Sequence, residues 1–333
     1  DQLAKTFQAR KEQGYVRECH GDLHLGNVAV LGTKPVIFDC IEFSDEYRFI
    51  DVMSEIAFLG MDLDAHGHPE HAWRLLNACL QDSADYAGLQ VLRFYQVYRA
   101  LVRCKVICLR LRQSGQVGSE ASRGTGRYRR YLDLACSYIR PAATFITITH
   151  GLSGSGKTTV SQLLLENPGA IRIRSDIERK RLQGLAVDVK THSALNAGIY
   201  SGASTERTYD RLLELARLIL DAGYPVIVDA TFLCRTQRMK FHCLAQQRGI
   251  PFTIMDCQAE QKQLRERVEK RLREDKDPSE ASLTVLEAQI ATCEKLDATE
   301  TPWRIIMDMS APFDLLAKTG AIQKVREFHF RNY

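Results

Sequence analysis

The stretch Gly151-Leu152-Ser153-Gly154-Ser155-Gly156-Lys157-Thr158 decides how the second half of this sequence is interpreted. Its spacing is G-x-x-x-x-G-K-T, and the chemistry explains each residue type. Glycines let successive backbone N–H groups turn inward around an anion, which a Cβ would obstruct. The lysine adds a positive charge within reach of the β- and γ-phosphates of a nucleotide, and the threonine hydroxyl can bind Mg²⁺. The stretch therefore predicts a phosphate-binding loop (P-loop).

The residues on either side of the loop support this interpretation. Residues 145–150 form a short β-prone run, and residues 159–165 favour a helix whose N-terminus faces the anion. An ordinary glycine turn, the alternative, would not require this order of strand, loop and helix. We therefore predict that ATP is bound by Gly151, Ser153, Gly154, Ser155, Gly156, Lys157, Thr158 and Thr159.

Length and composition restrict the class of protein. The chain has 333 residues, enough for two domains, with 45% hydrophobic residues, 26% charged residues and a net charge of +4. This mild charge neither requires nor excludes a nucleic-acid partner. No apolar run approaches the roughly 18–20 residues that span a bilayer, and the ten cysteines contain no C-x-x-C pair. We expect a cytoplasmic protein with no membrane partner.

The second half of the chain alternates between β-prone and helix-prone segments. This order predicts an α/β fold in which a doubly wound parallel sheet places the phosphate site at the carboxyl ends of its strands. We assign residues 141–333 to this domain. The expected strands are 145–150, 170–174, 225–229, 251–257 and 303–308, and the expected helices are 157–166, 176–183, 204–222, 234–248, 260–274 and 282–296.

Charged residues follow these strands, and a basic helix comes late in the domain. Asp176 follows the second expected strand, Asp229 ends the third, and Arg265, Arg267, Arg271 and Arg273 lie on the basic helix. With the P-loop, residues 145–310 resemble the P-loop kinases of the polynucleotide-kinase, gluconate-kinase and zeta-toxin type. The resemblance implies that Asp176 activates the acceptor hydroxyl and that Asp229 and Thr158 serve Mg²⁺. It also implies catalytic roles for Lys157, Arg267 and Arg271, with Arg273 as a weaker candidate.

Each of these roles has a simpler alternative. Asp176 could cap the helix that follows it, and Asp229 could be a turn residue at a strand end. The basic helix could be a solvated face with pairs such as Glu266 and Lys270.

The first half contains a second motif, His20-Gly21-Asp22-Leu23-His24-Leu25-Gly26-Asn27, followed by a β-prone run that ends at Asp39. From residue 15 to about 112 it resembles the C-terminal lobe of the aminoglycoside phosphotransferase and choline-kinase-like group. The resemblance implies that Asp22 is catalytic, orienting an acceptor hydroxyl, and that Asn27 and Asp39 hold Mg²⁺. It suggests a structural role for Asp51. A polar turn is the alternative for the cluster.

We predict that this mainly helical kinase-like C-terminal lobe occupies residues 1–140. Helices are expected at 49–60, 69–86, 88–113 and 127–140, with a loop at 114–126 and a polar loop around Asp62, Asp64, His66, His68 and His71. No segment before Gly14 supplies the nucleotide-covering lobe of that group, and the chain begins with Asp1. Either that lobe was removed from this chain or this half is not an active kinase as it stands; we expect removal, and hence a fragment of a longer protein.

The predicted function is an ATP- and Mg²⁺-dependent phosphotransferase. Its P-loop domain would transfer the γ-phosphoryl group to a hydroxyl of a small molecule, sugar- or aminoglycoside-like. One alternative is a polynucleotide 5′-hydroxyl kinase, which usually needs a basic groove with interleaved aromatic residues. Another is a nucleotide-responsive regulatory module with slow ATPase activity.

Overall fold

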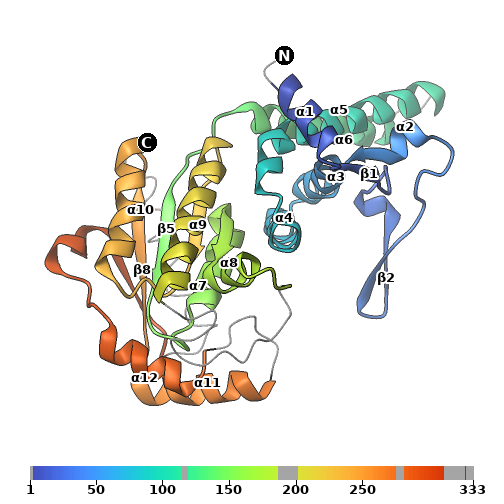
Figure 1. Ribbon diagram of the computed structural model, residues 1–333. Helices are drawn as coiled ribbons and strands as arrows, with labels where there is room; N and C mark the ends of the chain where they lie inside the picture. The colour runs from blue at the N-terminus through green and yellow to red at the C-terminus, as the bar shows by residue number, and fades with distance from the viewer. Residues whose placement is uncertain (1–2, 115–118, 187–201, 275–280, 311–326, 328–333) are drawn as a thin grey trace. The chain divides into compact units, whose positions relative to one another are not determined.

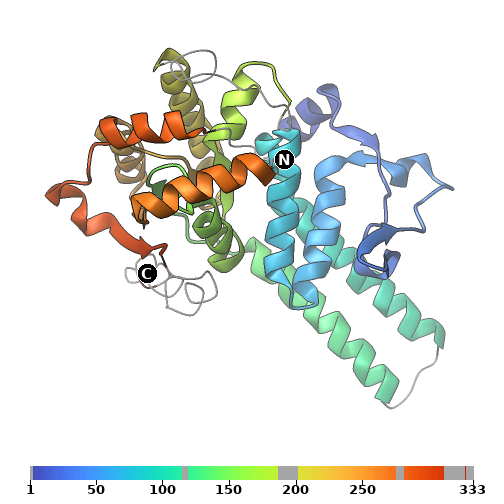
Figure 2. The same cartoon turned by 90° about the horizontal axis from the view of Figure 1, so that it is seen from below.

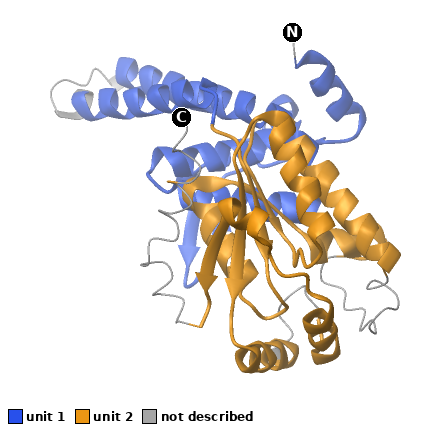
Figure 3. Cartoon of the chain, turned by 90° about the vertical axis from the view of Figure 1, so that its left-hand side faces the viewer, with its two compact units in different colours: residues 1–142 blue, residues 143–333 orange. Residues whose placement is uncertain are grey.

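The computed structural model describes residues 3–114, 119–186, 202–274, 281–310 and 327. The chain divides into two compact units, residues 1–142 and residues 143–333 (Figure 3). Within the described residues, no helix combines the length and the apolar character needed to cross a membrane.

Unit 1 is mainly helical and carries two small antiparallel sheets. Strand β1 pairs with β4, and β2 pairs with β3 in a hairpin. Its core is a cluster of buried residues from the long helices, including Phe58, Met61, Ala100 and Tyr131. The elements are α1 (Ala4–Glu12), β1 (Val16–Glu18), η1 (Leu25–Asn27), β2 (Val28–Leu31), β3 (Lys34–Ile37), α2 (Asp45–Arg48), β4 (Phe49–Asp51), α3 (Val52–Ala65), α4 (Pro69–Ser83), η2 (Tyr86–Gly88), α5 (Leu89–Ser114) and α6 (Ser119–Ile139) (Figure 1).

A buried arginine connects three segments of unit 1. Arg10 of α1 binds Asp51 (Nε–Oδ2 2.7 Å) and Asp85 (Nη2–Oδ2 2.8 Å), and all three side chains are at most 3% exposed. Asp51 also accepts a hydrogen bond from the backbone N–H of Met53, which caps α3. Asp51 therefore has a structural role, because it positions α3 and compensates a buried guanidinium.

Three expectations for unit 1 are wrong in detail. The loop expected at 114–126 is helical from Ser119 onward. A Cβ at Gly124 would lie 2.5 Å from a methyl carbon of Leu111, so this glycine lets α6 pack closely on α5. The helix expected from residue 49 begins at Val52, because residues 49–51 pair as β4.

The polar loop expected around residues 62–71 is also mostly helical. Asp62 and Asp64 belong to α3, and His71 belongs to α4. Asp62 is buried and accepts hydrogen bonds from Tyr131 (2.6 Å) and from the backbone N–H of Leu25 (2.9 Å). Hydrogen bonds from residues distant in sequence therefore satisfy the buried carboxylate of Asp62, which the sequence analysis places in a polar loop.

Unit 2 contains a five-stranded parallel sheet with the order β6-β7-β5-β8-β9, which confirms the predicted α/β class and parallel sheet. The strands are β5 (Ile146–His150), β6 (Ile171–Arg174), β7 (Val226–Asp229), β8 (Phe252–Gln258) and β9 (Arg304–Asp308). The helices are α7 (Lys157–Leu164), α8 (Ser175–Leu182), α9 (Gly202–Asp221), α10 (Arg235–Arg248), α11 (Gln261–Glu274) and α12 (Leu283–Thr292) (Figure 2). A π-helical turn, η3 (Leu165–Gly169), follows α7, and a 3₁₀ segment, η5 (Ala298–Trp303), precedes β9.

The strand order places the P-loop where the winding direction changes. From β5 the chain moves outward to β6, returns to β7, and then passes β5 to reach β8. Right-handed crossovers require α7 to cover one face of the sheet, and α9 and α10 to cover the other. Every residue of β5 and β7 is buried, which follows from this two-sided cover. Ligands bind at such a switch point, at the carboxyl ends of the strands.

Candidate phosphoryl-transfer site

The P-loop connects β5 to α7, and its backbone requires glycine. Gly151, Gly154 and Gly156 have φ values of +140°, +82° and +85°. A Cβ at Gly151 would lie 2.6 Å from the carbonyl oxygen of Cys257, and one at Gly154 would lie 2.9 Å from that of Leu264. Because backbone atoms cannot move aside cheaply, residues with a side chain would strain the loop at both positions.

The Lys157 side chain folds over the loop. Its Nζ donates a hydrogen bond to the carbonyl oxygen of Leu152 (2.7 Å). Burial of the ammonium group lowers the pKa of Lys157, while the charges of Asp229 and Asp176 act in the opposite direction. An anion bound in the loop would restore the stability of the charged form.

Two polar groups of the loop differ in their partners. The Ser155 hydroxyl oxygen is buried and makes no hydrogen bond to any described residue. The Ser153 backbone N–H donates to Oε1 of Gln289 on α12 (2.9 Å). Ser153 lines the cavity and Ser155 does not, so of the two residues only Ser153 offers its N–H to an anionic ligand there.

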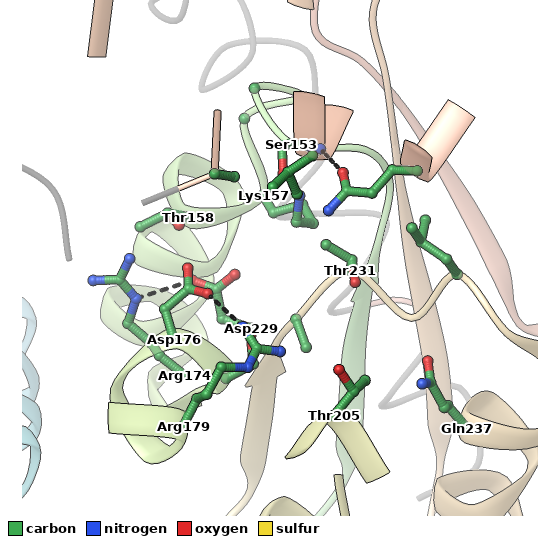
Figure 4. Close-up of a pocket in the computed structure, with 18 of the residues that line it drawn as sticks. Ser153, Lys157, Thr158, Arg174, Asp176, Arg179, Thr205, Asp229, Thr231 and Gln237 are labelled. Carbon is green, nitrogen blue, oxygen red and sulfur yellow. Dashed lines mark hydrogen bonds and ion pairs between the residues drawn. The ribbon is translucent and has the colours of Figure 1, made fainter. Parts of the chain in front are cut away.

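Asp229 ends β7 next to the strand that leads into the P-loop. Its carboxylate is 5% exposed, accepts a hydrogen bond from the Ser161 hydroxyl (3.0 Å) and lies 3.6 Å from Nε of Arg174. Asp229 and Thr158 line the same cavity (Figure 4). A carboxylate and a hydroxyl are hard oxygen ligands, so these two residues fit Mg²⁺.

Asp176 lies in the first turn of α8, where the helix dipole favours its charge. The N-cap of α8 is Arg174, so Asp176 is not the capping residue. Its carboxylate pairs with Nη1 of Arg179 one turn later (3.3 Å) and faces the cavity (Figure 4). The pairing fixes the direction of a carboxylate beside the phosphate loop.

The arginines of α11 have different positions. Arg267 donates to the carbonyl oxygen of Met309 (2.7 Å) and approaches that of Gly154 (3.5 Å), and Arg271 donates to that of Ala281 (3.1 Å). Both line the cavity. Arg265 instead pairs with Glu287 on the exposed surface, and Arg273 is exposed and does not line the cavity. The structure therefore brings two of these four arginines to the P-loop.

The cavity that these residues share has a volume of about 400 Å³. Among the described residues that line it, positive charges outnumber negative ones: the cations are Lys157, Arg174, Arg179, Arg267 and Arg271, and the anions are Asp176 and Asp229. This balance suits a polyphosphate. Gly154, Gly156, Ser153, Thr158 and Thr159 complete the phosphate side, whereas Gly151 and Ser155 do not line the cavity.

The opposite wall was missed in the sequence. It contains Thr205 from α9, Thr231 from the segment after β7, and Gln237 from α10 (Figure 4). Tyr209 of α9 also lines the cavity. The Tyr209 hydroxyl accepts a hydrogen bond from the backbone N–H of Phe232 (2.9 Å), which links α9 to that segment. Thr205 and Tyr209 occur four residues apart and therefore share one helix face, and this spacing is the signal in the sequence that could have identified them.

In unit 1 the structure brings Asp22 and Asn27 together. Asn27 Nδ2 donates to the backbone carbonyl of Asp22 (3.0 Å) and lies 3.4 Å from its carboxylate. A hydrogen bond from His24 lowers the pKa of Asp22. Asp39 is exposed, has a φ of +62°, and follows Phe38, whose N–H donates to the carbonyl oxygen of Asn27 (3.1 Å). The three polar residues therefore lie around one backbone junction.

Comparison with known proteins gives the following likenesses. Residues 146–296 match a family of AAA domains. An uncharacterized protein of Mycobacterium bovis and two of Mycobacterium tuberculosis are 32% identical over 227 residues, which is 68% of this chain and 44% of theirs. The chain thus spans less than half the length of these relatives.

Among solved structures, a gluconokinase from Sinorhizobium meliloti 1021 is 18% identical, with a TM-score of 0.40, over 58% of this chain and 99% of its own. The APS kinase of Mycobacterium tuberculosis, solved with AMPPNP and APS, is 21% identical, with a TM-score of 0.39, over 57% of this chain and 98% of its own. The family match lies within unit 2 and includes the P-loop and four of the five sheet strands.

Proposed function

We propose that unit 2 is an ATP- and Mg²⁺-dependent phosphotransferase that moves the γ-phosphoryl group of ATP to a hydroxyl of a small molecule. The observation that carries the proposal is the convergence of Lys157, Arg267 and Asp176 on one cavity. Nucleotide binding alone would need the loop and its lysine. A carboxylate and arginines facing the same space are what phosphoryl transfer adds.

The loop and its neighbours would hold the nucleotide. Backbone N–H groups and Lys157 bind the phosphates, and Arg267 and Arg271 neutralise charge on the transferred group. Thr158 and Asp229 hold Mg²⁺, which when bound neutralises phosphate charge and orients the phosphates. Nε of Arg174 lies 3.6 Å from the Asp229 carboxylate and helps to hold it in place.

Asp176 would orient the acceptor hydroxyl and accept its proton. Its pairing with Arg179 fixes the carboxylate, so the attacking oxygen meets a positioned base rather than a mobile one. Arg179 also remains beside the acceptor, where it favours an acceptor with an oxygen-rich surface.

The acceptor wall supports a small polar substrate, sugar- or aminoglycoside-like. Thr205, Thr231 and Gln237 offer hydroxyl and carboxamide groups, and the cavity volume of about 400 Å³ must also accommodate the triphosphate. A polynucleotide 5′-hydroxyl is the weaker alternative. The single aromatic side chain in the described cavity lining is Tyr209, whose hydroxyl is engaged and which is 3% exposed, so it offers little surface for base stacking.

The resemblance of unit 1 to a phosphotransferase C-terminal lobe belongs to the same proposal. Asp22 would orient an acceptor hydroxyl there, and Asn27 and Asp39 would serve Mg²⁺. Its support is the local grouping of the three residues.

The test is a phosphotransfer screen with labelled ATP across sugars, aminoglycosides, nucleosides and oligonucleotides. We expect a labelled small molecule from the wild-type chain. Asp176→Asn should retain ATP binding but reduce transfer by about 10²-fold or more, because it removes the acid–base group. Phosphate release without any labelled acceptor would support the slow ATPase module instead, and transfer that persists in Asp176→Asn would remove Asp176 from the mechanism.

A further inference from the structure

Gln289 reaches the P-loop from α12, 136 positions after the residue that it contacts. The contact joins the Ser153 backbone N–H to Oε1 of the glutamine at 2.9 Å. Gln289 lines the same cavity as Lys157 and Thr158. A neutral side chain from a distant helix therefore lies among the groups that surround the phosphates.

The contact determines how the carboxamide is oriented. A backbone N–H can only donate, so the atom opposite it must be the carboxamide oxygen. The Nε2 atom, with two N–H donors, is therefore the free end of the group, and it makes no hydrogen bond to another described residue. Donors fixed in this way need little reorganisation when an anion enters.

Packing holds Gln289 at this distance from the loop. Leu286 of α12 is fully buried against Leu264 and Val268 of α11, and Leu152 of the P-loop packs against the same cluster. A Cβ on Gly154 would lie only 3.2 Å from a methyl carbon of Val268. Loop, α11 and α12 thus share one apolar core, which places the Gln289 side chain.

The part of the loop that Gln289 contacts is the part next to the lysine ammonium. Lys157 Nζ donates to the carbonyl oxygen of Leu152, the residue directly before Ser153. A P-loop lysine binds the β- and γ-phosphates. The Ser153 side of the loop is therefore the side of the terminal phosphates.

We propose that Nε2 of Gln289 donates a hydrogen bond to the terminal phosphoryl group of bound ATP, with the Ser153 N–H as its anchor. The inference rests on the proposed function, because it needs a nucleotide in the loop. It adds a specific contact: a residue that distinguishes ATP from ADP by reading the γ-phosphate. A carboxamide suits this task because it donates without adding charge to a cavity that already contains several cations.

The experiment is calorimetric titration of the full chain with Mg-ADP and with a non-hydrolysable Mg-ATP analogue. We expect Gln289→Ala to weaken binding of the ATP analogue about tenfold, the loss of one hydrogen bond to a charged group. Binding of ADP should stay within about twofold of wild type, because ADP lacks the group that Gln289 contacts. Gln289→Glu should weaken binding of the ATP analogue, relative to ADP, by more than Gln289→Ala does. Its carboxylate still accepts a hydrogen bond from the Ser153 N–H but repels the γ-phosphate.

Gln246→Ala is the matched control, because Gln246 is exposed on α10 and does not line the cavity. It should change neither affinity. An equal loss for both nucleotides in Gln289→Ala would overturn the inference, since Gln289 would then only brace the loop. Tighter binding of both would also overturn it, because Oε1 would then compete with phosphate for the Ser153 N–H.

The failure of the proposed function would look different. Wild-type protein that binds neither nucleotide would overturn the proposed function and this inference with it. If Gln289→Ala does not fold, as judged by circular dichroism, the comparison between Gln289→Glu and wild type decides the question.

Discussion

The two units place acidic residues after short strands in different surroundings. In unit 2, Asp229 is 5% exposed, and the P-loop, a helix N-terminus and neighbouring strand ends surround it. In unit 1, the Asp22 side chain is 44% exposed, and Asp39 is exposed as well. The difference teaches that a parallel sheet gathers charges from distant segments into one enclosed space, whereas a local loop leaves them beside their neighbours and solvent.

Burial also gives the two units opposite responses to pH. In unit 2, burial lowers the pKa of Lys157. In unit 1, burial raises the pKa of Asp64 to about 6, although a hydrogen bond from Tyr138 acts against this shift. Burial disfavours the charged form of Lys157 until an anion binds in the loop. Burial also disfavours the charged form of Asp64, which has no such ligand in the proposal.

The largest effect should come from Lys157→Ala. Removing the ammonium from the loop should lower phosphoryl transfer by about 10³-fold and abolish tight ATP binding, since a preorganised charged donor is lost. Binding is measured with a fluorescent ATP analogue and transfer with labelled ATP. Unchanged ATP affinity would contradict the assignment of the P-loop and remove the contrast between the units.

The next largest effect should come from replacing the buried arginine of each unit. Arg238 of unit 2 binds Glu300 through two contacts of 2.6 and 2.9 Å, with both side chains at most 1% exposed, and Arg10 has the same role in unit 1. Arg238→Met and Arg10→Met should each lower the free energy of unfolding of their own unit by about 3–5 kcal/mol, because a buried carboxylate loses its partner.

The chain's two tryptophans allow this measurement unit by unit. Trp73 lies in unit 1 and Trp303 in unit 2, so Trp73→Phe and Trp303→Phe backgrounds report urea unfolding of one unit each. Arg265→Met, which breaks an exposed pair with Glu287, is the control and should leave the free energy of unfolding nearly unchanged, because solvent screens the pair. Equal losses in all three variants would show that burial does not set the cost.

A smaller effect is expected from Asp64. Because its pKa is about 6 in the folded state and lower when unfolded, the folded state binds more protons between these values. The stability of unit 1 should therefore fall as pH rises through about 6. Asp64→Asn should remove this dependence and stabilise unit 1 at neutral pH by about 1–2 kcal/mol, followed through Trp73 fluorescence. A wild-type unit 1 whose free energy of unfolding does not depend on pH would contradict this prediction.

The smallest effect should come from Asp22→Asn. If transfer takes place at the P-loop, this substitution should change the rate by less than about twofold, within the usual scatter of surface substitutions. Steady-state transfer with the acceptor found in the screen is the measurement. A large loss of transfer rate would indicate that phosphoryl transfer takes place in unit 1.

Much of unit 2 could be predicted because its signals are local. Gly151 to Thr158 specify a loop, and each predicted strand differs from the observed one by a single residue at one or both ends. Asp176 and Asp229 were recognisable from their places after strands. In unit 1, Gly124 looked like part of a loop, and only its contact with Leu111 explains why it lies in a helix.

The sequence by itself determined the P-loop, the alternation of strands and helices, and the residue types that phosphate chemistry needs, because these depend on neighbours in the chain. Tertiary structure alone decided that Gln289 meets Ser153, that Arg267 but not Arg273 lines the cavity, and that Thr205 and Gln237 line the same cavity as Asp176. These contacts join segments far apart in sequence. Their distances follow from how helices pack on a shared sheet, which no local pattern encodes.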